Sequence, residues 1–308
     1  MTLTAAQLTR NTLQAKLGLW ASNLRENYDV VRRSRDITDL PPRPGPALCL
    51  GAGPSLPLHL DEIRRFKGTV FSCERNLVPV LEHGVVPDYV CSIDGDPILA
   101  QFVDHPLVRD HKGEMVGLFS TTVSPDIVRK WPGEMVFFNS WIDNFEEYKS
   151  VSLVFQNLTG KTTMHNGGTC GSTLWYAAMT LDCNPMVLIG IDYAYHGIGY
   201  LDETQIWKMV RHLPEKQILE HYCRYTNSFG NNVITDAAWD CLSGALASWL
   251  NLIKDHTTFQ CSDYTIIDQP PLVCIPFRHY LDEIQEKGVK FSTSTVRPTI
   301  IDIRVPQG

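Results

Sequence analysis

The sequence predicts an α/β fold, a Rossmann-like and mostly parallel sheet with helices on both faces. An N-terminal helical arm precedes the sheet, and the C-terminal part is expected to be rich in helix. The first observation is an alternation of short apolar runs with helical segments, which is typical of a parallel sheet covered on both faces. The second is that glycine-rich and acidic segments directly follow several apolar runs, where the ligand crevice of such a sheet forms.

Apolar positions at steps of three, four and seven predict a helix over residues 3–33, and the Pro-rich segment 34–45 ends it. Strands are expected at 47–53, 68–74, 89–94, 114–120, 134–139, 185–192 and 264–268. Helices are expected at 56–66, 76–84, 171–182, 203–213, 236–255 and 278–288. These elements divide the chain into an arm (1–40), a Rossmann-like domain (41–290) and a C-terminal tail (291–308).

Composition excludes several classes of protein. The net charge of −7 argues against a general binder of nucleic acid or anionic membranes. No window approaches the roughly 18 apolar residues of a membrane span, and the first twenty residues lack the layout of a signal peptide. The nine cysteines are scattered without a CxxC pair, so we expect reduced thiols in a cytoplasmic protein.

The segment GAGPSL, residues 51–56, follows the first predicted strand. Gly51 and Gly53 allow backbone N–H groups to approach a ligand, Pro54 follows them, and Ser55 is placed to cap the next helix. A helix N-terminus of this kind suits a phosphate. The segment is neither a complete GxGxxG nor a Walker A motif, so a tight turn with a serine cap is the alternative.

Acidic residues follow the next two strands. Glu74 is placed to bond a ribose hydroxyl and Asn76 to hold a base or a second hydroxyl, unless Asn76 simply caps a helix. Asp94 and Asp96 flank Gly95, and paired carboxylates of this kind bind Mg²⁺ and pass it to phosphate oxygens. An Asx-turn is the alternative for this pair.

Two later segments complete the candidate site. A second glycine-rich turn precedes a helix and is expected to hold an acceptor or a second phosphate; it contains Asn166, Gly167, Gly168, Thr169 and Ser172. The last strong strand ends in a group that could grip a flat ring or supply a base, namely Asp192, Tyr193, Tyr195 and His196.

Four cations are candidates for a phosphate, with no spacing signal to single one out: Lys161, Lys208, Arg211 and Arg224. A triad of Ser172, His196 and Asp192 can be assembled on paper. The chain lacks a GxSxG elbow, however, so a hydrolase is not favoured.

Four motifs in this order carry a resemblance: GAGPSL, GVVPDYVCSID, NGGTCGSTLWYAA and MVLIGIDYAY. Together they resemble the MptE-like family, which joins archaeal 6-hydroxymethylpterin diphosphokinases with the core domain of bacterial flagellar motility accessory factors. The likeness runs from about residue 45 to 200 and more weakly beyond. The first motif also resembles the GxGPSL of bacterial sialyltransferases that use CMP-sialic acid. One departure is Tyr193, because the family often has leucine after the aspartate.

The resemblance implies a nucleotide-dependent transferase. The first hypothesis is a Mg²⁺-dependent diphosphokinase that moves a diphosphoryl group from ATP to a hydroxymethylpterin-like acceptor, with Asp94, Asp192 and His196 as catalytic residues. The alternative is a glycosyltransferase that uses a CMP-activated nonulosonic sugar, with His196 or Asp192 as the base. A third is a non-catalytic module that binds nucleotide or sugar. The partners expected are therefore small molecules, together with a homo-oligomer formed through the N-terminal arm.

Overall fold

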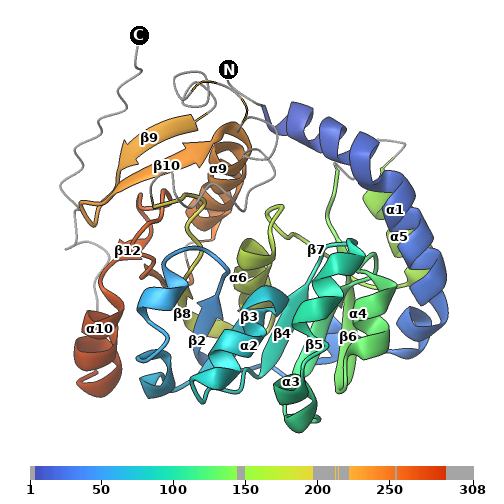
Figure 1. Cartoon of the computed structure of the whole chain (residues 1–308), viewed down its shortest axis with the longest axis horizontal. Helices are drawn as coiled ribbons and strands as arrows, with labels where there is room; N and C mark the ends of the chain where they lie inside the picture. The colour runs from blue at the N-terminus through green and yellow to red at the C-terminus, as the bar shows by residue number, and fades with distance from the viewer. Residues whose placement is uncertain are drawn as a thin grey trace.

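A parallel sheet forms the centre of the computed structural model, which describes residues 4–143, 150–196, 212, 214, 222–253 and 255–288 (Figure 1). All its neighbouring strands are parallel. Their order is β1 (Arg35–Asp36), β6 (Glu134–Ser140), β5 (Val116–Ser120), β4 (Tyr89–Ser92), β3 (Thr69–Cys73), β2 (Gly45–Leu50), β8 (Cys183–Ile189), β11 (Thr258–Gln260) and β12 (Val273–Cys274), with β7 (Thr163–Met164) beside β6. The predicted Rossmann-like α/β fold is confirmed.

The strand order reverses beside β2. From β2 the chain adds β3, β4, β5 and β6 on one side, and it then returns to place β8, β11 and β12 on the other. The carboxyl ends of β2 and β8 therefore lie side by side at a topological switch point, the usual place of a ligand crevice in open α/β sheets.

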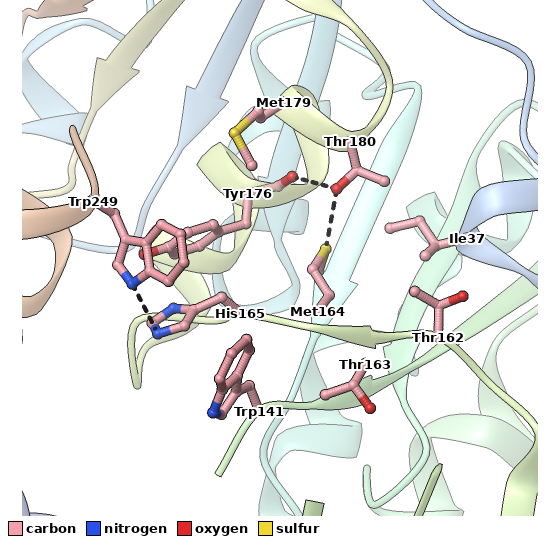
Figure 2. A pocket seen from close by; sticks show the side chains of 10 residues that line it. All are labelled: Ile37, Trp141, Thr162, Thr163, Met164, His165, Tyr176, Met179, Thr180 and Trp249. Carbon is pink, nitrogen blue, oxygen red and sulfur yellow. Dashed lines mark hydrogen bonds between the residues drawn. The ribbon is translucent and has the colours of Figure 1, made fainter. Parts of the chain in front are cut away.

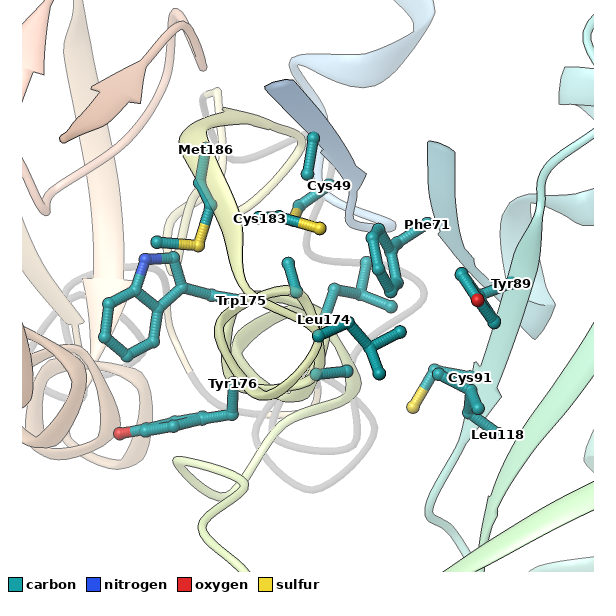
Figure 3. Packing of buried hydrophobic residues seen from close by; sticks show 14 of the residues in the cluster. Cys49, Phe71, Tyr89, Cys91, Leu118, Leu174, Trp175, Tyr176, Cys183 and Met186 are labelled. Carbon is teal, nitrogen blue, oxygen red and sulfur yellow. The ribbon is translucent and has the colours of Figure 1, made fainter. Parts of the chain in front are cut away.

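Buried side chains cover both faces of this sheet. In β2, Cys49 packs into the cluster around helix α6 (Cys170–Thr180), as Figure 3 shows, whereas Leu48 and Leu50 pack into a cluster on the other face. Because both faces are covered, the strands are continuous apolar runs without alternation. Short helices α2 (Leu77–Glu82), α3 (Pro106–Asp110), α4 (Pro125–Lys130), α5 (Val151–Thr159) and α10 (Phe277–His279) complete the layers.

The N-terminal arm is a single long helix, α1 (Ala5–Arg33), that begins with a capping box between Thr4 and Gln7. Two of its side chains are buried against loops at the carboxyl ends of strands. The amide of Asn23 donates to the carbonyls of Gly95 (2.9 Å) and Thr122 (3.1 Å), and that of Asn27 donates to the Val123 carbonyl (2.8 Å). Helix α1 thus lies over the loops after β4 and β5. The domain boundary at residue 40 and the role in oligomerisation stay predictions.

Several predicted elements need correction. The segment 56–66 forms two 3₁₀ turns, η2 (Leu56–Leu58) and η3 (Ile63–Arg65), instead of an α-helix. Its apolar residues Leu60, Ile63 and Phe66 are three apart, a spacing that a 3₁₀ turn shares with an α-helix. The predicted strand 264–268 is an irregular segment that begins in a turn at Tyr264, and the sheet takes β11 and β12 on either side of it.

The C-terminal part contains the expected helix α9 (Ala237–Leu252) and an antiparallel hairpin of β9 (Tyr222–Thr226) and β10 (Asn232–Asp236), which was not predicted. The last predicted helix is α10 followed by a π-helix, η7 (Tyr280–Glu286). The helix predicted at 203–213 lies outside the described residues except for His212, which is in a turn, and the tail after 288 lies outside them entirely. Of the helices that the structure describes, none is both long and apolar enough to span a membrane.

Candidate functional site

Three loops meet at the switch point: residues 51–55 after β2, 190–196 after β8 and 262–264 after β11. The Gly51 N–H donates to the Ile189 carbonyl and the Gly53 N–H donates to the Gly190 carbonyl, each over 2.8 Å. A Cβ atom on Gly51 would overlap the Gly190 carbonyl. The loops after β2 and β8 therefore approach each other this closely only because Gly51 and Gly190 carry no side chains.

Asp192 joins the three loops from a fully buried position. Its Oδ2 accepts the Ser55 N–H (3.0 Å), its Oδ1 accepts the Ser55 hydroxyl, and Ser55 Oγ in turn accepts the Tyr264 N–H (2.9 Å). Burial raises the pKa of Asp192 to about 7, although both hydrogen bonds from Ser55 oppose the shift. Asp192 is therefore a carboxyl group that changes its protonation near neutral pH.

Two histidines make contacts with the loop after β11. The Nε2 atom of His59 lies 2.5 Å from Asp263 Oδ2, and this pair links the turn after Ser55 to the loop after β11. The exposed ring of His196 stacks on Tyr264, with the ring centroids 4.2 Å apart and an angle of 11° between the planes. The imidazole of His196 is thus accessible and its orientation is set by Tyr264.

The second glycine-rich turn lies at the start of α6. Gly167 and Gly168 have left-handed φ values of 58° and 78°, and Asn166 Oδ1 accepts the Gly168 N–H at 2.9 Å. Thr169 caps the helix by accepting the Ser172 N–H (3.0 Å). The Thr169 hydroxyl also lies 3.2 Å from the Tyr193 hydroxyl, which connects this turn to the loop after β8.

A cavity of about 860 Å³ lies beneath the first half of α1. Its walls come from α1, from the loops after β4, β5, β6 and β7, and from α9. Its polar lining includes Arg10, Thr122, Ser140, Asn166 and the backbone of Gly167. The second glycine-rich turn therefore borders a space large enough for a small-molecule ligand.

The part of this chain that holds these motifs matches a known protein family. A family model described as 6-hydroxymethylpterin diphosphokinase MptE-like matches residues 20–197. The chain belongs to the MptE-like family.

Among solved structures, this MptE-like chain is similar to the MAf glycosyltransferase from Magnetospirillum magneticum AMB-1. The TM-score is 0.57 at 16% sequence identity, and the likeness covers 87% of this chain and 35% of that one. The chain therefore spans about a third of the length of its structural neighbour. No curated protein matches the sequence. The family description indicates a transferase, and the structural likeness supports the fold.

The structure changes how several predicted site residues of the MptE-like chain are understood. Ser55 makes no cap hydrogen bond to η2, and it binds Asp192 instead. The N–H groups of Gly51, Gly53 and Ser55 all have protein acceptors, and Pro54 has no backbone N–H group. Contact between this loop and a nucleotide stays a prediction.

Glu74 and Asn76 both point inward. The Asn76 amide donates to the Leu50 carbonyl (2.8 Å) at the end of β2, and it makes no helix cap. Glu74 Oε2 lies 3.4 Å from the Cys170 thiol, and burial raises the pKa of this carboxyl well above its usual range. In this arrangement the two side chains hold the ends of β2 and β3 against α6.

Asp94 and Asp96 make the turn that the sequence offered as the alternative to a metal site. Asp94 Oδ1 accepts the Asp96 N–H (3.1 Å), and Asp96 Oδ1 accepts the Ile98 N–H (3.0 Å). Lys16 Nζ from α1 lies 3.9 Å from the half-exposed Asp94 carboxylate. Among the described residues, no group of three or more His, Cys, Asp or Glu side chains gathers around a metal position. A Mg²⁺ ion here would need further oxygen ligands, from water or from a bound phosphate, to complete its coordination.

Ser172, His196 and Asp192 do not form a catalytic triad. Ser172 Oγ donates to the Asn166 carbonyl (2.6 Å), whereas Asp192 binds Ser55. Tyr195 pairs with Ile234 of the hairpin, and its hydroxyl accepts the indole N–H of Trp239.

The four candidate cations are dispersed. Lys161 is buried and donates to the Ser34 carbonyl, which removes it from the phosphate candidates. Arg224 lies in β9, and Lys208 and Arg211 lie outside the described residues.

Sequence reasoning missed His59, Asp263 and Tyr264. The sequence offers little signal for them, because β11 (Thr258–Gln260) holds a single apolar residue, and only the strand order places residues 262–264 at the same edge of the sheet as Gly51 and Asp192.

Proposed function

We propose that the chain is a glycosyltransferase that takes its sugar from a nucleotide-activated donor, a CMP-activated nonulosonic sugar. The observation that supports this most is the chemistry of the switch point. In the described structure, the three loops 51–55, 190–196 and 262–264 carry Asp192, Asp263 and His196 and contain no Lys or Arg.

This composition suits proton transfer better than polyphosphate binding. Transfer of a diphosphoryl group from ATP depends on neutralising several negative charges on the phosphates. Glycosyl transfer to a hydroxyl depends on a base that removes the hydroxyl proton. The exposed imidazole of His196 supplies a base, while the three loops offer no Lys or Arg to a multiply charged phosphate chain.

In the proposed reaction, an acceptor hydroxyl attacks the anomeric carbon of the donor sugar. The bond from that carbon to the phosphate oxygen breaks, and CMP leaves with the electron pair. His196 takes the hydroxyl proton, since its ring is exposed and oriented by Tyr264. Asp192 is a positioning residue, because it holds Ser55 and through it the loop that carries Tyr264.

The diphosphokinase is the second candidate, and the family description favours it. ATP would then lie over residues 51–55, and a hydroxymethylpterin-like acceptor would lie near Asn166 and Thr169. Asp94 and Asp96 would hold Mg²⁺, which would neutralise charge on the phosphates when bound.

Release of CMP from a CMP-activated nonulosonic sugar, measured in EDTA with water as the acceptor, tests the proposal. We expect release by the wild-type chain and a fall of roughly 100-fold or more in His196→Gln, the usual contribution of a general base. His111→Gln is the matched control. His111 caps the C-terminus of α3 and pairs with Glu114, and neither residue belongs to the switch-point loops. AMP formation from ATP that requires Mg²⁺, with no CMP release, would replace this proposal by the second candidate. Nucleotide binding with no turnover of either donor would contradict both reactions and support a non-catalytic binding module.

A further inference from the structure

Four aromatic side chains surround a second, smaller cavity of about 230 Å³. Trp141 follows β6, His165 follows β7, Tyr176 lies on α6 and Trp249 lies on α9. Figure 2 shows His165 between the two indoles, with Tyr176 beside it. The His165 ring centroid lies 4.7 Å from Trp249, 4.8 Å from Tyr176 and 5.5 Å from Trp141. Four elements of the chain therefore contribute to one aromatic pocket.

The size and polarity of the pocket limit what it can hold. Its volume is below the roughly 300–1,000 Å³ of sites for drug-sized ligands, so it suits a single ring. The remaining lining consists of Ile37, Thr162, Thr163, Met164, Met179 and Thr180. No lining residue carries a fixed charge, and burial lowers the pKa of His165 to about 4, which leaves it neutral at pH 7. A ligand in this pocket is therefore uncharged.

The angles between the rings oppose a flat ligand. The planes of the aromatic pairs meet at 44° to 85°, so none of these pairs forms a parallel slot. A flat heterocycle stacks best between or on parallel faces. A puckered ring instead presents C–H bonds in several directions, which suits walls that are tilted against each other.

Two N–H donors face the two ring nitrogens of His165, and a neutral imidazole can accept from only one of them. The Trp249 indole N–H points at His165 Nε2 (3.0 Å), and the Gly167 N–H points at Nδ1 (3.2 Å). A neutral imidazole has one acceptor nitrogen and one N–H, so it satisfies only one of these two donors. A ligand hydroxyl both donates and accepts, and it would resolve this conflict.

We propose that this pocket binds an uncharged pyranose ring of the acceptor. The inference rests on the proposed glycosyl transfer and names the acceptor class for it. A nonulosonic donor sugar carries a carboxylate, so the pocket suits the acceptor and not the donor. Trp141 and His165 also line the 860 Å³ cavity, so a group attached to the bound ring extends toward Asn166 and Gly167.

Calorimetric titration with three methyl pyranosides (of N-acetylglucosamine, mannose and galactose) and with pterin tests the pocket. We expect at least one pyranoside to bind, with the Kd raised about tenfold or more in Trp249→Leu, because loss of an aromatic anchor commonly has this effect. Trp141→Leu, in the loop after β6, is the second variant should Trp249→Leu fail to fold. Trp131→Phe is the control, since Trp131 packs on Phe119 in a different core.

Binding of no pyranoside, equal binding in the variants of Trp249 and Trp141, or binding of pterin alone would each overturn the inference. Release of CMP from the donor sugar, measured in the same proteins, reports on the proposed function separately. Release without any pyranoside binding refutes the pocket alone. Pyranoside binding without release refutes the glycosyl transfer alone.

Discussion

Replacement of Asp192 by asparagine tests whether the buried carboxyl at the switch point keeps its proton in the folded chain. Burial raises its pKa from 3.8 to about 7 in the folded state. Between about pH 4 and pH 7 the folded chain therefore binds a proton that the unfolded chain has released. The stabilisation from this proton is complete below about pH 4 and is lost as the pH rises to about 7.

The size of the effect follows from the shift. About three pKa units at about 1.4 kcal/mol each give an order of about 4 kcal/mol over this pH range. Asparagine is neutral throughout. It also fits the site, because its Oδ1 accepts the Ser55 N–H and its Nδ2 donates to Ser55 Oγ. Relative to wild type, Asp192→Asn should thus gain up to about 4 kcal/mol of unfolding free energy between pH 4 and pH 8.

Urea unfolding at each pH, followed by far-UV circular dichroism, measures this difference. Asp61→Asn is the control, since the Asp61 side chain is 95% exposed. Its curve should run parallel to that of wild type. A constant difference between wild type and Asp192→Asn across the whole range would refute the raised pKa and with it the buried, protonated state.

Four other outcomes are expected. Gly53→Ala should lower the unfolding free energy by about 1–3 kcal/mol, because a Cβ there would overlap the Asp192 carboxyl. In contrast, Gly244→Ala should raise it by about 0.5–1 kcal/mol, because Gly244 lies in α9 with open space around it. Urea unfolding measures both changes. Asn23→Ala should cost about 1–3 kcal/mol, since two buried carbonyls lose their donor, and unchanged stability would contradict the docking of α1. Asp94→Asn should leave stability within about 0.5 kcal/mol and CMP affinity unchanged in calorimetry, because asparagine supports the same turn; a selective loss of Mg²⁺-dependent ATP binding would instead support the second candidate. Alkylation of freshly denatured protein should titrate close to nine thiols, and four or more missing would contradict the free state of every cysteine.

Local sequence patterns predicted most of the sheet. The runs around Leu48 and Val187 are apolar throughout, and only burial on both faces gives a strand that composition. The helix over 56–66 was predicted wrongly because a three-residue apolar spacing does not separate a 3₁₀ turn from an α-helix. The hairpin of β9 and β10 was missed because its residues do not alternate: residues 233–235 of β10 are all buried, and β9 buries Tyr222 alone.

The candidate site was harder to predict because its contacts are distant in the sequence. Ser55 and Asp192 are 137 residues apart, and Asn23 reaches Thr122 across 99 residues. The sequence placed Ser55 and Asp192 at strand ends, yet only the strand order shows that β2 and β8 are neighbours. Likewise, no local motif indicates that Asp263 would face His59.

Calorimetric titration of CMP and ATP into the wild-type chain, each in EDTA and in Mg²⁺, separates the two candidate functions. Under glycosyl transfer, CMP binds with the same affinity in both conditions and more tightly than ATP, because the switch-point loops supply acid–base groups and no Lys or Arg. Tight ATP binding that requires Mg²⁺, with no binding of CMP, would contradict it.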